Sequence, residues 1–407
     1  MEKVKLGIIG LGQRGYQIAE TIANCVQEID IVAVSDSFQD RVDQTLNMIK
    51  EKRGCVAVQY KDYHDMLLDD NVDAVFVATG WESHVGVSIE CMRANKATAM
   101  EVGGAYNLEE LWELVNVWEE TKVPFMFMEN CCFGEYELMA TNMVRQGVLG
   151  KISHCSGAYA HDLREEIAKS RDKVHYRRQN YIDRNCENYP THELGPIAKI
   201  LGINRGNRMT KLVSVSSIAQ GFHEYVVECD EADKSLLDVE FKQGDIVNTL
   251  ITCEDGRTIA LKLDTALPRF YSREFSVHGT KGLYSELAHA VFIEGCGNHW
   301  DTRSFLGNDT SFLDKYSTKM WQALTPEDRE SGHGGMDLFE LKAFAKALIN
   351  NEDMPIDVYD AASWMAITCL SEESIKNGVQ MEIPDFTRGK YKNRPLKDVI
   401  DWEKERL

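Results

Sequence analysis

The sequence has no long hydrophobic run and little positive charge. No apolar stretch approaches the roughly 20 residues that a membrane-spanning helix needs. The 45 lysines and arginines are outnumbered by 65 aspartates and glutamates, which gives a net charge of -20. Nucleic-acid affinity depends mainly on cationic side chains, and the sequence contains no basic run. A nucleic acid or an anionic membrane surface is therefore not the expected partner.

Metal-type cysteine spacings and a secretory leader are also lacking. The 11 cysteines are scattered, apart from the adjacent Cys131 and Cys132, and none falls in a CxxC or cysteine–histidine zinc spacing. No metal is expected, and reduced structural thiols fit a cytosol. The start, Met1-Glu2-Lys3, passes directly into an apolar pattern without signal-peptide features. We therefore expect a cytoplasmic protein, unless a leader has been removed.

The first third of the chain alternates between strand and helix patterns. A chain of 407 residues with 43% hydrophobic residues is long enough for two domains and a large core. The expected strands cover 5–10, 29–35, 72–79, 97–102 and 124–129, and the expected helices cover 38–52, 83–94 and 107–121. Fully apolar strands that alternate with helices indicate a parallel sheet covered on both faces.

The rest of the chain has a different rhythm, in which β-rich segments follow one another. The turn Glu254-Asp255-Gly256 indicates a hairpin, so the sheet is expected to be mostly antiparallel. The expected strands cover 152–160, 212–219, 235–241, 246–253, 257–266 and 273–284, and helices are expected at 336–349 and 357–377. This pattern predicts an α+β domain with a large open sheet.

A glycine-rich turn follows the first expected strand, in the order Gly10-Leu11-Gly12-Gln13-Arg14-Gly15. In such a turn the glycines allow a tight bend, close approach to a pyrophosphate and close helix packing. Asp36, at the end of the second strand, would accept the ribose 2'-hydroxyl. This carboxylate favours NAD over NADP, although the nearby Arg41 leaves NADP open. A glycine-rich turn in a sheet that binds no ligand is the alternative.

The sequence thus predicts two domains. Residues 1–130 are expected to form an NAD-binding Rossmann domain with a doubly wound parallel sheet, in which Gly10, Gly12, Gln13, Arg14 and Gly15 contact the cofactor. Residues 131–407 are expected to form the α+β domain that binds substrate and mediates oligomerisation.

This domain order resembles the glucose-fructose oxidoreductase, inositol dehydrogenase and rhizopine catabolism family. Sugar dehydrogenases of that family carry Glu-Lys-Pro on the fifth strand, where the lysine contacts the substrate. The present chain has Glu101-Val102-Gly103 at that place. The missing lysine makes the dehydrogenase interpretation less favourable.

Longer blocks resemble one branch of the family, the NAD-dependent glycosidases of glycoside hydrolase family 109, known as α-N-acetylgalactosaminidases. The blocks cover 129–150, 189–196, 203–217, 268–282 and 332–337. The resemblance implies that NAD is bound by Arg14, Gly15, Asp36, Trp81, His84, Glu101, Val102, Asn130 and Tyr189. It implies that the sugar is bound by Tyr159, Arg177, Tyr189, Pro190, Thr191, His192 and Tyr271. It also implies a homo-oligomer, either a dimer or a tetramer.

Two positions depart from the family pattern. Gly103 stands where the family usually has proline, and Tyr176 stands where it usually has tryptophan. Because Tyr176 precedes the sugar-binding Arg177, the second departure bears on which sugar is preferred.

The resemblance also implies an unusual hydrolytic reaction. Most glycosidases use two carboxylates across the scissile bond, but nicotinamide-dependent families are exceptions. Loss of a hydride from C3 of the sugar would give a ketone and acidify the C2 proton. Deprotonation at C2 would expel the leaving group at C1, water would add, and the hydride would return to C3. NAD is then expected to stay tightly bound and to be recycled on a terminal α-linked N-acetylgalactosamine or related hexosaminide.

Such a reaction needs groups that transfer protons. His192 is the expected base for the C3 hydroxyl, because imidazole accepts a proton near neutral pH. Thr191 is the expected N-cap of a helix that starts there. Tyr189 is the candidate for a second proton transfer, which requires a nearby cation such as Arg177 to lower its pKa. A buried structural histidine remains the alternative for His192.

Two further alternatives stay open from the sequence. The protein could be an NAD-dependent sugar or inositol dehydrogenase, or a non-catalytic sensor that binds NAD or a sugar. The segment Gly332-His333-Gly334-Gly335-Met336-Asp337 could line a site or cap the helix that follows it.

Overall fold

The computed structural model describes residues 2–169 and 175–405. The chain divides into two compact units. The first unit comprises Met1–Gly134, Lys319–Ala362 and Asp398–Leu407, and the second comprises Glu135–Thr318 and Ser363–Lys397. Among the described residues, no helix combines the length and the apolar character needed to cross a membrane.

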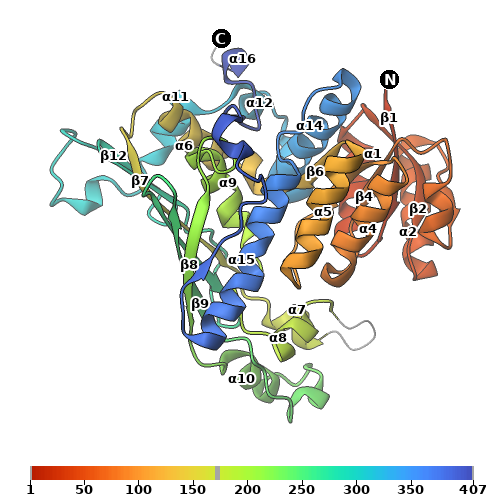
Figure 1. Ribbon diagram of the computed structural model, residues 1–407, viewed down its shortest axis with the longest axis horizontal. Coiled ribbons are helices and arrows are strands. Elements are labelled where there is room, and N and C mark those ends of the chain that lie inside the picture. The colour runs from red at the N-terminus through yellow and green to blue at the C-terminus, as the bar shows by residue number, and fades with distance from the viewer. Residues whose placement is uncertain (1, 170–174, 406–407) are drawn as a thin grey trace. The chain divides into compact units, whose positions relative to one another are not determined.

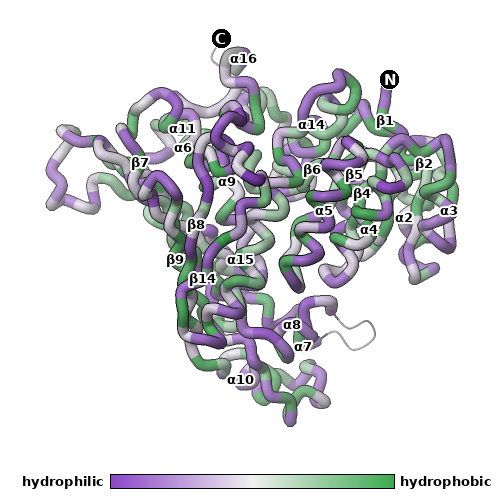
Figure 2. The backbone as a smooth tube through the Cα atoms, in the orientation of Figure 1, coloured by the Kyte–Doolittle hydropathy of each residue, from purple (hydrophilic) through white to green (hydrophobic). Residues whose placement is uncertain are grey.

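A six-stranded parallel sheet forms the centre of the first unit (Figure 1), with strand order β3-β2-β1-β4-β5-β6. Most of its residues are buried. Hydrophobic residues prevail along its strands, which Figure 2 colours by hydropathy. The order reverses between β1 and β4, which is the topological switch point of a doubly wound fold. The strands are β1 (Val4–Ile9), β2 (Ile29–Ser35), β3 (Val58–Tyr60), β4 (Ala74–Val77), β5 (Ala97–Glu101) and β6 (Phe125–Met128).

Amphipathic helices connect these strands. Helix α1 packs on α2, and α4 packs on α5. A capping box between Asn107 and Glu110 starts α5, whose buried residues Leu111, Leu114 and Val115 follow the helical period. The helices are α1 (Gln13–Cys25), α2 (Gln39–Arg53), α3 (Tyr63–Leu67), α4 (Trp81–Arg93) and α5 (Leu108–Thr121). The predicted parallel α/β sheet is therefore confirmed.

A helix from the C-terminal part of the chain also belongs to the first unit. Helix α14 (Met336–Asn350) packs against α1, β1 and the 3-10 turn η1 (Asn130–Phe133). The turn η4 (Gly332–Gly335) precedes it and contains His333 with a φ of 49°. The short helices α12 (Lys319–Gln322), α13 (Pro326–Glu330) and α16 (Trp402–Glu405) also lie in this unit.

An eight-stranded sheet forms the second unit, with strand order β13-β12-β11-β7-β10-β9-β8-β14. Only the β7–β10 pair is parallel, and the other neighbours are antiparallel. The predicted hairpin at Gly256 is confirmed between β9 and β10. The strands are β7 (Ile152–Ala160), β8 (Met209–Ser216), β9 (Ile246–Cys253), β10 (Thr258–Asp264), β11 (Ser276–Gly279), β12 (Gly282–Ser285), β13 (Ala290–Ile293) and β14 (Met381–Glu382).

Helices cover one face of this second sheet. Helix α9 (Thr191–Leu201) packs on β7 and on α6 (Glu135–Arg145). A Cβ at Gly157 of β7 would lie 2.7 Å from Glu193 Cβ, so a glycine is needed for this close approach. Buried and exposed residues alternate along β9, as expected for a sheet with one covered face. The other helices of this region are α7 (Arg164–Lys169), α8 (Arg178–Asp183), α10 (Gly221–Glu228), α11 (Asp309–Tyr316) and α15 (Val358–Asn377).

The prediction of strands was wrong at several places. The expected strand 273–284 is divided into the antiparallel strands β11 and β12, and β13 and β14 were not predicted. Residues 235–241 form no strand, because Asp233 accepts hydrogen bonds from the amide and the hydroxyl of Ser235 at 3.1 and 2.7 Å and starts a 3-10 turn instead. Strand β3 was missed, because its 3 residues are too few for a clear pattern. The fold class itself, a Rossmann domain plus an α+β domain with a mostly antiparallel sheet, is confirmed.

Candidate active site

The glycine turn of the first unit is shaped for close backbone packing. Gly10 has a φ of 90°, and a Cβ there would lie 2.5 Å from the Ala78 oxygen. A Cβ at Gly15 would lie 2.0 Å from the Gly10 oxygen. Gly12 is the N-cap of α1 and offers no side-chain cap, so the first amides of the helix are available to an anion.

Asp36 follows β2 and is held by the turn. Its Oδ2 accepts a hydrogen bond from the Leu11 amide at 2.6 Å, and its Oδ1 accepts one from the Phe38 amide at 2.8 Å. Arg41 lies 3.7 Å from the same carboxylate and stacks on the Phe38 ring at 4.4 Å. The carboxylate is therefore held in one orientation by the protein itself. It also lies beside Arg41, the residue that left NADP open as the cofactor.

The side chain of Arg14 reaches from α1 to the end of β5. Its Nε donates to Glu101, whose other oxygen accepts a hydrogen bond from the Val102 amide at 2.8 Å. Val102 is buried and brings no amino group to this place. A Cβ at Gly103 would lie 2.6 Å from Trp81 Cδ1, which gives a physical reason for glycine at this departure from the family pattern.

Asp337 brings the beginning of α14 into the same cluster. Its carboxylate accepts hydrogen bonds from Arg14 and from Asn130 Nδ2, the latter at 2.8 Å, and lies 3.0 Å from His333 Nδ1. Burial alone would raise the pKa of Asp337, but the charges of Arg14 and His333 hold it well below its usual range. Of the two alternatives for the glycine-rich segment, the one in which it lines a site agrees with this geometry.

The start of α4 presents Trp81 and His84 beside the end of β4. His84 Nε2 lies 2.6 Å from the Thr79 carbonyl oxygen, which makes Nε2 the protonated nitrogen. Burial lowers the pKa of His84, so this imidazole is neutral near pH 7. Both side chains are buried.

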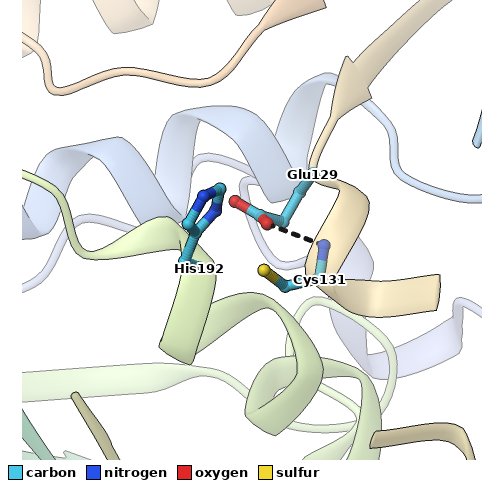
Figure 3. Close-up of side chains that lie close together, drawn as sticks. All are labelled: Glu129, Cys131 and His192. Carbon is cyan, nitrogen blue, oxygen red and sulfur yellow. Dashed lines mark hydrogen bonds between the residues drawn. The ribbon is translucent and has the colours of Figure 1, made fainter. Parts of the chain in front are cut away.

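Beyond β6 the chain turns into η1. The Cys131 amide donates to Glu129 Oε1 at 3.1 Å, as Figure 3 shows. Cys131 and Cys132 are buried and form no disulfide, which agrees with the expectation of reduced structural thiols. Figure 3 also draws His192, which extends from the first turn of α9 in the second unit.

These features of the first unit fit a dinucleotide. The turn permits close approach of a pyrophosphate to uncapped amides, and Asp36 is positioned for a ribose hydroxyl. The predicted residues Gly10, Gly12, Gln13, Arg14, Gly15, Asp36, Trp81, His84, Glu101, Val102 and Asn130 all lie in this unit, whereas Tyr189 lies in the second.

The second unit gathers aromatic side chains around the start of α9. Tyr159, from the end of β7, has its ring centre 4.6 Å from that of Tyr189 and 5.5 Å from that of His192. The Tyr189 hydroxyl lies 3.4 Å from His192 Nε2. All three side chains are buried. The two residues predicted to transfer protons are therefore in contact with each other.

Arg177 lies among these rings. Its guanidinium is 4.6 Å from the centre of the Tyr189 ring and 5.6 Å from that of Tyr159. Its Nη1 donates to the Tyr159 hydroxyl at 3.4 Å, and its Nε donates to the Tyr176 hydroxyl at 3.0 Å. The cation required near Tyr189 is thus present, and Tyr176 orients it through a hydroxyl that tryptophan would lack.

His161 is a member of this aromatic cluster that the sequence did not single out. Its Nδ1 lies 3.1 Å from the Tyr159 hydroxyl, and its ring contacts that of Tyr271 at 5.3 Å. Tyr271 is half-exposed, so it lies at the open side of the cluster. Burial lowers the pKa of His161. The feature of the sequence that could have indicated His161 was its position two residues after Tyr159, at the end of an expected strand.

The start of α9 differs from the prediction at one residue. Thr191 is the first helical residue, and Pro190, with a φ of -73°, is the N-cap. The expected Thr191 cap was wrong, because the proline ring already fixes the backbone angle that begins the helix. His192 lies in the first turn, directly after Thr191.

Comparisons with protein families cover both parts of the chain. Residues 4–129 match the model "Oxidoreductase family, NAD-binding Rossmann fold", and residues 133–393 match "Glycosyl hydrolase 109, C-terminal domain". The chain belongs to glycosyl hydrolase family 109. The predicted resemblance is thereby confirmed, as is the NAD-binding Rossmann domain.

Curated relatives agree with this family. The family 109 chain is 36% identical to a "Glycosyl hydrolase family 109 protein" of Stenotrophomonas maltophilia, over 96% of this chain and 91% of that protein. It is 34% identical to an "Alpha-N-acetylgalactosaminidase" of Tannerella forsythia, over 96% and 88%. It is 36% identical to an "Alpha-N-acetylgalactosaminidase" of Shewanella oneidensis, over 97% and 88%.

Solved structures share the fold of this family 109 chain. A levoglucosan dehydrogenase in complex with NADH and L-sorbose has a TM-score of 0.71 at 15% identity, over 95% of this chain and 100% of that one. A scyllo-inositol dehydrogenase from Lactobacillus casei has a TM-score of 0.65 at 16% identity, over 94% and 98%. At these identities the likeness concerns the fold alone.

Proposed function

We propose that this family 109 protein removes terminal α-linked N-acetylgalactosamine, or a related hexosaminide, from a small glycoside or glycan, with NAD tightly bound and recycled. Two relatives at 34% and 36% identity bear the name of that activity. The observation that carries the proposal is the buried contact of Tyr189, His192 and Arg177 inside the part matched by the family 109 model.

The first unit would hold the cofactor. Asp36 would accept the ribose hydroxyl, the uncapped start of α1 would bind the pyrophosphate, and Arg14 with Glu101 would line the other half. When bound, NAD would supply a reversible hydride acceptor for C3 of the sugar, so that hydrolysis involves no net oxidation. The low pKa of His84 keeps a neutral imidazole in the cofactor-binding unit.

The second unit would hold the sugar and move its protons. His192 would take the proton of the C3 hydroxyl, since imidazole is suited to proton transfer near neutral pH. Tyr189 would exchange the C2 proton, and the Arg177 guanidinium beside its ring would stabilise the phenolate. The hydroxyl of Tyr159 would stay protonated and donate to the sugar, because burial raises its pKa although Arg177 opposes this effect.

The alternative of a sugar dehydrogenase predicts a different fate for the cofactor. A dehydrogenase would release one reduced cofactor for each substrate molecule that it oxidises. The proposed glycosidase would return the hydride to the sugar and would accumulate no reduced cofactor. Val102, at the place of the lysine of the dehydrogenases, cannot transfer a proton, and this residue favours the glycosidase.

An NMR time course in heavy water tests the proposal. The purified full-length protein would be supplied with p-nitrophenyl α-N-acetylgalactosaminide, without metal or reductant. We expect release of p-nitrophenol and a sugar that carries deuterium at C2, because the C2 proton exchanges with solvent during the reaction. Cleavage without deuterium at C2 would contradict the elimination route. Absence of cleavage, together with reduction of added NAD by free sugars, would replace the proposal by the dehydrogenase alternative.

A further inference from the structure

A buried charge cluster in the first unit joins the glycine turn to a helix far along the chain. Arg14 follows the second glycine of the turn and donates both to Glu101, at the end of β5, and to Asp337, in the first turn of α14. The side chain of Asp337 is fully buried, and that of Glu101 is 5% exposed. The residues Arg14 and Asp337 are separated by 323 positions.

The glycines before α14 are needed for this cluster. A Cβ at Gly332 would lie 2.3 Å from Asp337 Oδ2, so any other residue would displace the carboxylate. Gly335, with a φ of 99°, turns the chain into the helix, and His333 is held with a φ of 49°. His333 Nδ1 then lies 3.0 Å from both Asp337 Oδ2 and Arg14 Nη1. The local backbone is thus shaped to bring a histidine and a carboxylate to Arg14.

Glu340 adds a third carboxyl group one turn further along α14. It is fully buried, lies 3.9 Å from Arg14 Nη2, and accepts no hydrogen bond from the described part of the chain. Burial, Glu101 and Asp337 raise the pKa of Glu340, so it stays protonated at neutral pH. One arginine therefore faces two carboxylates, Glu101 and Asp337, and His333 is a further partner of Asp337.

The strand order tells which half of a dinucleotide this cluster would meet. In a doubly wound sheet the two halves of the cofactor bind on either side of the switch point. Asp36 follows β2 and belongs to the adenosine side, whereas Glu101 ends β5 and belongs to the other side. The cluster thus lies on the nicotinamide side, where the oxidised ring is a cation and the reduced ring is neutral.

We propose that Asp337 is a positioning residue of the cofactor site, which holds Arg14 against Glu101 and fixes a negative charge that favours the oxidised cofactor. This inference rests on the proposed function only in that NAD is the cofactor. It assigns a role to the glycine-rich segment 332–337 that its place in the sequence leaves open.

Equilibrium titrations of NAD⁺ and NADH into the cofactor-free, full-length protein test the inference. We expect Asp337→Asn to weaken NAD⁺ binding about tenfold and NADH binding less than threefold, because the lost charge matters only to the cationic ring. A merely structural role would weaken both forms equally. Equal weakening, or affinities within twofold of the unmodified protein for both forms, would overturn the inference.

Asp309 offers a matched control in the second unit. It too is a buried aspartate in the first turn of a helix, and it is approached at 3.2 Å by His289, which also has a positive φ. We expect Asp309→Asn to leave both cofactor affinities within twofold. Thermal unfolding of the cofactor-free variants would measure any loss of stability that the two substitutions share.

A single substitution of Arg14 keeps the inference testable if Asp337→Asn does not fold, and a double variant adds a further test if it does. Lysine at position 14 keeps the charge of the cluster but cannot bind two carboxylates with one planar fork. Arg14→Lys should therefore weaken the binding of both cofactor forms and leave the ratio of NAD⁺ to NADH affinity within twofold, and a changed ratio would overturn the inference. In the double variant Arg14→Lys/Asp337→Asn the two effects should not add, since they act through one contact. Additive effects would overturn the inference. If the unmodified protein binds no NAD, both proposals fail, whereas failure of sugar cleavage alone would leave this inference intact.

Discussion

Arg14 in the first unit and Arg177 in the second both lie at candidate binding sites, but their neighbours differ. Arg14 is bound by the carboxylates of Glu101 and Asp337. Arg177 lies among the rings and hydroxyls of tyrosines, with Tyr189 nearest at 4.6 Å. Two carboxylates hold an arginine in one geometry, whereas an arginine that lies over aromatic rings can donate hydrogen bonds to neutral hydroxyl groups. The difference agrees with the proposed binding of a charged cofactor by the first unit and of an uncharged sugar by the second.

Buried carboxyl groups in the two units show the same contrast. Asp337 has a pKa well below its usual range because Arg14 and His333 offset its burial. Glu187, two residues before Tyr189, has its pKa raised to about 8, because burial outweighs the hydrogen bond from the Tyr189 backbone. The contrast is between these two groups and not between the units as wholes, because burial also raises the pKa of Glu340 in the first unit.

The largest effect is expected from His192→Ala. Loss of the proposed base should lower kcat for glycoside cleavage about 10³-fold, while NAD⁺ affinity stays within threefold. Steady-state kinetics and cofactor titration would measure the two effects. His154→Ala serves as the control, since His154 lies earlier on the same strand as Tyr159 and contacts Thr258 at 2.9 Å. Loss of NAD binding or of folding in His192→Ala would return His192 to the structural alternative.

Arg177→Lys should lower kcat/KM about 100-fold, because a single ammonium group cannot reach the hydroxyls of Tyr159 and Tyr176 and also cover the Tyr189 ring. Tyr176→Phe removes one hydrogen bond at 3.0 Å and is expected to lower kcat/KM only a few-fold, about 1 kcal/mol. Equal kinetics for Arg177→Lys and the unmodified protein would contradict a binding role for Arg177.

Glu187→Gln should make stability less dependent on pH. Folding raises the pKa of Glu187 from 4.5 to about 8, so the folded protein keeps a proton that the unfolded chain loses between these values. The free energy of unfolding of the unmodified protein therefore falls as pH rises through this window. Glutamine stays neutral, and the variant should be more stable by about 2–4 kcal/mol at pH 8.5. Urea unfolding at pH 5 and pH 8.5 would measure the free energy of unfolding of the variant and of the unmodified protein. The same difference between the two proteins at both pH values would contradict the prediction.

Asp36→Ser in the first unit is expected to have a moderate effect, on cofactor affinity alone. Loss of the carboxylate should weaken NAD binding about tenfold, or about 1.4 kcal/mol. It should also release Arg41, now 3.7 Å from Asp36, for a 2'-phosphate, so NADP binding should improve. Parallel titrations with both cofactors would measure the preference. An unchanged ratio of NAD to NADP affinity would show that Asp36 does not select the cofactor.

Much of the fold could be predicted because its signals are local. The buried strands β1, β2, β4, β5 and β6 alternate with helices, and this alternation by itself indicates a parallel sheet. The glycine turn and Asp36 are recognisable because backbone geometry limits which residues fit there. Where local hydrogen bonding competes with periodicity, as at Asp233 and Ser235, the prediction was wrong.

The candidate site could be predicted only in part. The residues that the family resemblance supplied for the sugar, such as Tyr159, Tyr189 and His192, do lie together, but no pattern in the chain implies their contacts. His161 was missed, because a single histidine after a strand is a common and uninformative feature. The alternatives for the segment before α14 stayed open for the same reason.

The amino-acid sequence by itself determined the two-domain order, the glycine turn and the aspartate that follows β2. Each of these depends on interactions between residues that are close in the chain or repeat with a fixed period. Only the tertiary structure decided that Asp337 meets Arg14 across 323 positions, and that Arg177 lies among tyrosines from β7, from its own neighbour in the chain and from the loop before α9. The physical reason is that a buried charge takes its partners from whichever segments the packed core brings beside it.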